Sequence, residues 1–169
     1  MDTVSSASLE LARWLLAQEA RRSKKSGSTK SGSGGNRGAG PASGSSASIS
    51  ADEVVRVCEK LRSVLATFAG SAGFRSLLTR ALTLAKAQGL SLAGVQILED
   101  GTLDWPERGD VESSNGPTEK VEVGAVVLVT QLLDLLIVLV GQPITLRLLS
   151  SAWPDVPTGA LSSKAEESA

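Results

Sequence analysis

Histidine and tyrosine are absent from the sequence, and cysteine occurs once, as Cys58. Without histidine the chain lacks the most common general base and the most common metal ligand, which excludes most nucleophile–base pairs and most zinc sites. One cysteine cannot form an internal disulfide framework and is typical of a reducing compartment. Neither a GxxxxGK[ST] motif nor a GxGxxG motif in a strand–helix context is present. The sequence therefore predicts a protein that is not an enzyme and has no cofactor, catalytic residue or metal site.

The balance of charge excludes a strong general attraction to nucleic acid or anionic lipid, because the formal net charge of the 169 residues is −1. Basic residues do gather between positions 21 and 37, in "RRSKK" and at Lys30 and Arg37. No aromatic residue that would stack on bases lies among them. We therefore interpret this basic run as solvated and expect no nucleic-acid partner.

The N-terminal third consists of a short helix and a linker. Residues 7–22 have the periodicity of an amphipathic helix. Residues 23–50 are almost all Ser, Gly, Ala, Lys and Arg, so they bury too little apolar area to offset chain entropy and are predicted to be disordered. The predicted organisation is an N-terminal amphipathic helix (1–22), a Gly/Ser linker (23–50), a helical core domain (51–155) and a disordered tail (156–169).

Two amphipathic helices open the core domain. Ser50 and Glu53 have the spacing of a capping box, and Ile49 and Val54 that of a hydrophobic staple. "GSAG" at 70–73 separates a helix at about 51–69 from one at about 73–88. Their apolar stripes are, for the first helix, Val54, Val57, Cys58, Leu61, Leu65 and Phe68, and for the second, Phe74, Leu77, Leu78, Ala81, Leu82 and Ala85. Cys58 is interpreted as a buried structural thiol, because no histidine is present to activate it.

Residues 94–105 predict a short β-hairpin, since Val95 and Ile97 alternate with polar residues ahead of an Asp-Gly turn. Acidic residues gather in and after it: Glu99, Asp100, Asp104, Glu107, Asp110 and Glu112. The spacing does not fit a calcium-binding EF-hand, because the twelfth position from Asp100 is Val111 instead of glutamate. We expect a solvated loop over 106–118.

The segment "VEVGAVVLVTQLLDLLIVLVGQPITLRLL", Val121 to Leu149, is the longest apolar run. Its β-branched start would suit a buried strand, but its unbroken length predicts a helix over 121–141. Gly141 ends this helix, and Pro143 suits the first turn of a second one that continues to Leu149.

Two interpretations of 121–141 compete. The segment has the roughly 20 residues that cross a bilayer, so a single-span membrane protein is one alternative. Asp134 opposes it, because an aspartate at a helix centre costs about 2.5–3.5 kcal/mol on insertion. Lys120, Gly124, Thr130, Gln131, Asp134 and Gly141 fall on one stripe, as in a core helix that reaches the surface along one edge. The two amphipathic helices also need a partner of this size. We therefore expect a core helix, with Gln131 and Asp134 at the bundle edge.

The segments "RVCEKLRSVLATFAGSAGFRSLLTRALTLAKA", "EDGTL" and "LVTQLLDLLIVLVGQPITLRLLSSAWPDVP" resemble an uncharacterised bacterial protein family of unknown function. The resemblance covers most of residues 53–157. It implies a bacterial cytoplasmic protein and transfers no functional residues.

The fold class predicted from the sequence is mainly α: a small helical bundle with a short β-hairpin insertion, preceded by a tethered amphipathic helix and a disordered linker. The predicted function is that of a non-enzymatic interaction or adaptor protein with a protein partner, in the cytoplasm. A membrane location is the alternative. Because an amphipathic helix can dock in a partner's groove, the predicted partner-binding residues are Leu11, Trp14, Leu15 and Leu16. Alternatively, the same helix docks on the core of its own chain.

Overall fold

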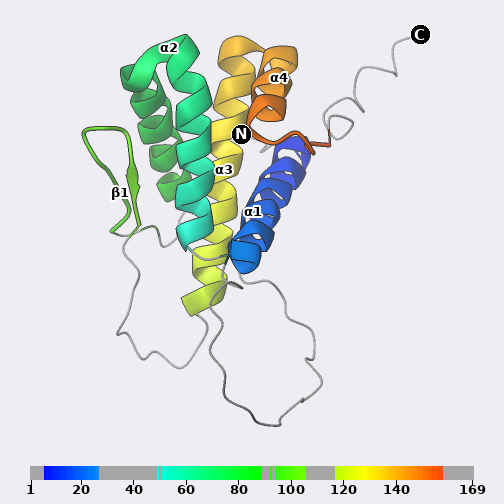
Figure 1. Ribbon diagram of the computed structural model, residues 1–169. Helices are drawn as coiled ribbons and strands as arrows, with labels where there is room; N and C mark the ends of the chain where they lie inside the picture. The colour runs from blue at the N-terminus through cyan, green and yellow to red at the C-terminus, as the bar shows by residue number, and fades with distance from the viewer. Residues whose placement is uncertain are drawn as a thin grey trace.

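A computed structural model of the chain describes residues 6–26, 49, 51–88, 92, 94–105 and 117–157. In chain order these residues form α1 (Ser6–Ser26), α2 (Ala51–Ala87), β1 (Gln96–Ile97), β2 (Leu103–Asp104), α3 (Pro117–Val140) and α4 (Gln142–Ala152). The helices pack into a bundle, and the hairpin lies beside α2 (Figure 1). The mainly helical fold with one small hairpin is thus confirmed. Most of the predicted linker, including Ser50 of the capping box, and most of the predicted tail lie outside the described residues.

α2 consists of two helical halves that meet at Gly70. Gly70 has φ 73° and ψ 168°, outside the helical region, and a positive φ of this kind is unstrained only in a residue without a Cβ. The chain turns back at this point, so the two halves lie side by side (Figure 1). The predicted break at 70–73 is therefore confirmed as a sharp bend.

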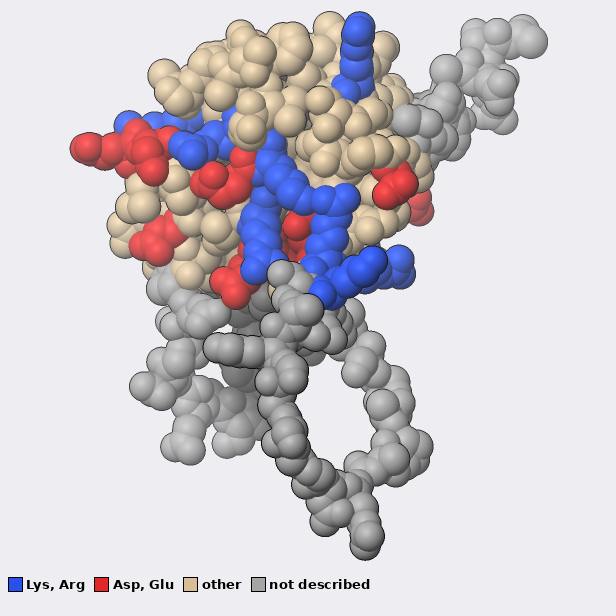
Figure 2. All heavy atoms as spheres, in the orientation of Figure 1, with Lys and Arg blue, Asp and Glu red and all other residues tan. Residues whose placement is uncertain are grey.

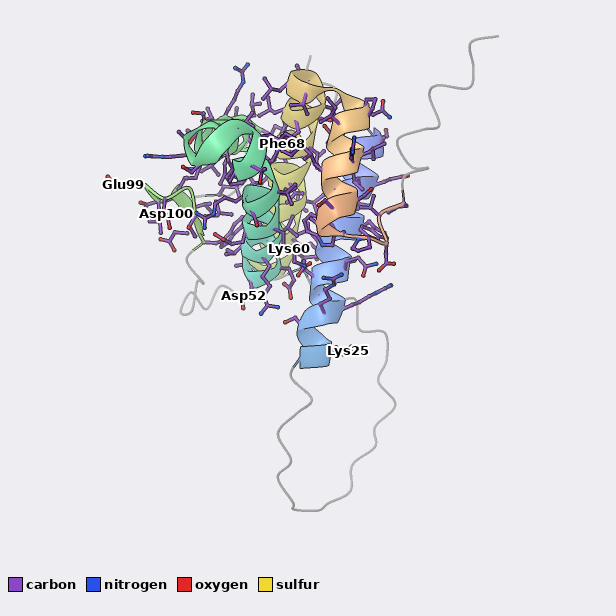
Figure 3. All side chains as sticks on the ribbon, turned by 45° about the horizontal axis from the view of Figure 1, so that its top comes forward. Lys25, Asp52, Lys60, Phe68, Glu99 and Asp100 are labelled. Carbon is purple, nitrogen blue, oxygen red and sulfur yellow. The ribbon has the colours of Figure 1, made fainter. Side chains whose placement is uncertain are left out.

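Both halves of α2 bury their apolar stripes except at Leu77, which is partly buried, and at Phe68. The buried members are Val54, Val57, Cys58, Leu61, Leu65, Phe74, Leu78, Ala81, Leu82 and Ala85. Phe68, predicted to belong to the first stripe, is 68 % exposed. The prediction is wrong here because Phe68 lies in the last turn before the bend, at the end of the bundle, where no described element covers it (Figure 3).

α3 is the central helix and packs against α1, α2 and α4. It is a helix throughout, so the strand alternative is excluded, and it begins at Pro117 instead of Val121. Its buried apolar residues are Ala125, Val126, Leu128, Val129, Leu132, Leu133 and Leu136. Gly141, with φ 90°, ends it, and α4 follows with Pro143 in its first turn. α4 continues to Ala152, three residues past the predicted Leu149.

The polar stripe of α3 does not reach the surface as predicted. Thr130 is fully buried and Gln131 is 5 % exposed, and the Thr130 hydroxyl donates to the carbonyl oxygen of Val126 at 2.6 Å. Asp134 is partly buried and bonded to Ser8 of α1. The prediction fails because it treated the first helix as a separate unit, whereas α1 packs along α3.

The core extends beyond the predicted domain at both ends of the chain. Leu11, Ala12, Leu15 and Leu16 of α1 are fully buried in the same apolar cluster as α2 and α3. Trp153 and Val156, which follow α4, belong to it as well. Full burial of a leucine side chain contributes about 1.5–3 kcal/mol, so α1 supplies a substantial part of the stability.

Candidate interaction site

The four predicted partner-binding residues lie on α1, which is docked on its own bundle. Leu11, Leu15 and Leu16 are completely buried, and Trp14 is partly buried against the core. The structure brings these residues together on one helix face, as predicted, and that face is occupied by α2 and α3. Binding of a partner by this face would require α1 to leave the bundle.

A hydrogen bond joins the first part of α1 to α3. The Ser8 hydroxyl donates to Asp134 Oδ1 at 2.5 Å, and Ser8 is fully buried. A short hydroxyl–carboxylate bond of this kind is charge-assisted and stronger than a neutral one. Asp134 is therefore a packing contact for α1 in the described fold.

A second polar contact secures the last part of α1. The carboxylate of Glu19, which is 3 % exposed, accepts a hydrogen bond from the Lys60 ammonium of α2 and one from the Trp153 indole N–H, the latter at 2.9 Å. The ammonium of Lys60 also lies 5.3 Å from the centroid of the Trp153 ring, within the range of a cation–π interaction. Three elements thus meet at one buried charge.

The pKa of Glu19 reflects these contacts. Burial by itself raises the pKa, but the hydrogen bonds from Lys60 and Trp153 and the positive charges of Lys60 and Arg22 outweigh it. The net result is a pKa below the ordinary value of 4.5, so Glu19 is ionised at neutral pH.

The remaining candidate groups are placed as structural features. Asp100 accepts hydrogen bonds from the backbone N–H and the hydroxyl of Thr102, and these bonds lower its pKa and stabilise the hairpin turn. Among the described residues no group of three or more Cys, Asp or Glu is arranged to hold a metal ion. The acidic residues Glu107, Asp110 and Glu112 lie outside the described residues. Cys58 is buried, and burial raises the pKa of its thiol to about 12.

The most unusual surface is an apolar patch at one end of the bundle, here called the apolar end. It consists of four exposed side chains that come from the bend of α2 and from the α3–α4 turn: Phe68, Val138, Leu139 and Ile144. Both connections lie at the same end of the bundle (Figure 1). Val138 is 84 % exposed and Leu139 61 %. Neither residues 63–74 nor residues 135–146 contain a charged side chain.

Most of the charged side chains on the visible face lie below this end. In Figure 2 the top of the molecule is largely tan, with a blue side chain that projects upward from it, while acidic side chains appear lower on the visible face. On one flank, α2 and the hairpin enclose a shallow, open depression lined by Ser71, Ala72, Arg75, Ser76, Thr79, Arg80 and Glu99. The apolar end is therefore bordered by hydroxyls and arginines.

Neither the contact among Glu19, Lys60 and Trp153 nor the apolar end was predicted from the sequence. The signal for the first set was weak: Glu19 falls on the same side of the helix as the buried Leu11, Leu15 and Leu16, as its spacing of three, four and eight residues from them implies. The signal for the apolar end was clearer, since an uncharged stretch surrounds each of the two predicted breaks, at Gly70 and at Gly141.

Comparison with known proteins adds no family to this description: no protein-family model, no curated protein and no solved structure matches the chain.

Proposed function

We propose that the chain is a non-enzymatic interaction module of the cytoplasm and that the apolar end is its contact surface. The exposure of Phe68, Val138, Leu139 and Ile144 together carries the proposal. Leu98 and Val123 are also exposed, but they lie apart on the hairpin and at the start of α3. Single exposed apolar residues are ordinary, whereas several at one end of a molecule indicate a binding surface.

The chemistry available supports a non-enzymatic role. A nucleophile needs an activating base or a lowered pKa, whereas the Cys58 thiol is buried with a raised pKa. Two carboxylates that are at least partly buried, Glu19 and Asp134, are both engaged in hydrogen bonds between helices. These groups act as structural bonds, so binding is the function that the arrangement favours.

The role proposed from sequence for α1 changes accordingly. With Leu11, Leu15 and Leu16 buried in the core, α1 serves first as part of the scaffold that holds the apolar end. Deleting residues 1–50 would expose the facing surfaces of α2 and α3, so a loss of binding in such a variant could not be distinguished from a loss of folding. A test has to act on the apolar end itself.

Photo-cross-linking provides this test. A photoreactive amino acid at position 138, 84 % exposed, is compared in living cells with the same group at position 123, which is 45 % exposed at the opposite end of α3. The proposal predicts that position 138 gives adducts to a molecule identified by mass spectrometry and that position 123 does not. Equal labelling from both positions would refute a specific contact surface at this end.

The second candidate function is a single-span membrane protein anchored by residues 121–141. The segment Glu122–Val140 of α3 has the length and composition of a membrane span, and this favours the candidate. Against it, 56 % of that segment is buried in the bundle, and its departure would uncover α1 and α2. Washing cell membranes with alkaline carbonate discriminates the two: a span remains in the pellet, whereas a surface-bound module is released.

A further inference from the structure

We infer that the apolar end docks on the surface of an anionic lipid bilayer, with its apolar side chains in the headgroup–acyl boundary and nearby arginines on lipid phosphates. The inference rests on the proposed function, because it names what covers the apolar end. The arginines, here called the arginine rim, are Arg75 and Arg147, both exposed and both within six residues of the turn that precedes their helical segment.

The composition of the apolar end suits the bilayer interface. Surfaces that lie in the interface combine Phe and Leu with Lys or Arg around them, and the apolar end combines Phe68, Val138, Leu139 and Ile144 with the arginine rim. All four side chains are exposed, and the two turns that carry them lie at the same end of the bundle (Figure 1).

Helix direction places the arginine rim correctly for this role. The second half of α2 and α4 both begin at the apolar end (Figure 1), and side chains on a helix lean towards its N-terminus. Arg75 and Arg147 therefore lean towards the surface that the apolar end would touch, whereas Arg80, ten residues from Gly70, lies about 15 Å from the bend at 1.5 Å per residue. Arg75 also donates to the backbone carbonyl of Glu99 at 3.4 Å, which holds it at the edge of the depression.

The depression between α2 and the hairpin has donors for a phosphate group. Arg75 and Arg80 line it together with the hydroxyls of Ser71, Ser76 and Thr79. Glu99 is the acidic residue among its lining residues, so cations outnumber anions there. Guanidinium groups and hydroxyls are the side chains that commonly bind phosphate oxygens.

Charge also argues against a second copy of the chain as the occupant. Two apolar ends placed face to face would bring two arginine rims together, and like charges across an interface oppose association. An anionic bilayer surface neutralises the same arginines. Lipid is thus the occupant that matches both the apolar and the charged parts of this end.

Vesicle flotation of the full chain tests the inference, with vesicles of phosphatidylcholine alone and of phosphatidylcholine mixed with phosphatidylserine. We expect binding to the acidic vesicles, weakened by salt, because screening reduces the attraction of arginines to anionic lipid. A variant with Val138→Ser and Leu139→Ser should bind at least about tenfold more weakly, given the apolar area removed. A variant with Arg75→Gln and Arg147→Gln should lose about tenfold, at roughly 1 kcal/mol for each charge.

The matched controls are Val123→Ser, on the same helix at the other end, and Arg56→Gln, near the start of α2. Both should bind as the wild type does, and thermal melting monitored by circular dichroism verifies that every variant is folded. A Phe68→Trp variant should shift its added fluorescence to shorter wavelength on acidic vesicles.

The lipid inference is overturned if folded wild-type protein does not float with acidic vesicles, or if Val138→Ser with Leu139→Ser binds as well as Val123→Ser. Failure of the two proposals is distinguishable. If vesicles are not bound but position 138 still gives a defined protein or self adduct, the interaction module stands and lipid is the wrong occupant. If position 138 gives no adduct above position 123, the proposed function itself fails.

Discussion

The indole N–H of Trp153 donates a hydrogen bond to the carboxylate of Glu19 at 2.9 Å, across 134 residues of chain. Because Lys60 of α2 bonds to the same oxygen, one carboxylate connects α1, α2 and the segment after α4. The apolar faces of these elements hold the bundle together, while this polar contact fixes the position of α1 along its own axis relative to the bundle.

Replacing Glu19 with Gln should lower the free energy of unfolding by about 1–3 kcal/mol, the cost of weakening a buried charged hydrogen bond. The amide oxygen still accepts from Trp153, so the loss reports chiefly the contact with Lys60. Urea denaturation followed by tryptophan fluorescence measures it. Glu10→Gln, at an exposed position of the same helix, is the control and should change stability by less than about 0.5 kcal/mol.

The stability contributed by Glu19 should depend on pH. Since its folded pKa lies below the ordinary value of 4.5, the contribution is fully present above about pH 4.5 and is lost as the pH falls through the folded pKa. The stability difference between the wild type and Glu19→Gln should therefore be largest near neutral pH and shrink in acid. A difference that stayed constant from pH 7 to below the folded pKa would contradict the ionised contact.

Replacing Leu15 with Ala should cost about 2–5 kcal/mol, as for other buried leucines that leave a cavity. Arg13→Ala, on the exposed side of α1, is the matched control and should be nearly neutral. Thermal melting of the two variants gives the comparison. Equal melting temperatures would mean that α1 is not docked on the bundle in solution.

Cys58 should be protected from alkylation in the folded protein. Burial raises the pKa of its thiol from the ordinary 9.0 to about 12, so at pH 8 it is both inaccessible and protonated. Iodoacetamide followed by mass spectrometry should label it only after denaturant is added. The raised pKa also means that stability is full below about pH 9 and declines as the pH rises towards 12, because the unfolded thiol ionises first.

Much of the scaffold could be predicted from the sequence because periodicity and breaking residues are local signals. The stripes of α2, the bend at Gly70 and the end of α3 at Gly141 all follow from residues near each other in the chain. The apolar face of α1 was predicted for the same reason. The surface against which α1 packs was not predicted, because amphipathic periodicity identifies the apolar face of a helix but does not identify the surface that covers it.

The candidate sites depended on information that is not local. The local sequence gives no sign of the contact among Glu19, Lys60 and Trp153. Their hydrogen bonds form only when three elements distant in the chain pack together. Phe68 continues the apolar stripe of its helix, and its exposure follows from the position of the bend at the end of the bundle. Asp134, interpreted as facing the surface, is explained by Ser8 on a helix more than 100 residues earlier in the chain.

The contact between Glu19 and Trp153 imposes an order on folding during synthesis. α1 leaves the ribosome first, yet the surface that buries it is completed only when α3 and the residues after α4 have been made. In the growing chain Leu11, Leu15 and Leu16 therefore lack their full cover until α3 has been made, and the bond from Trp153 to Glu19 forms only after α4 has followed.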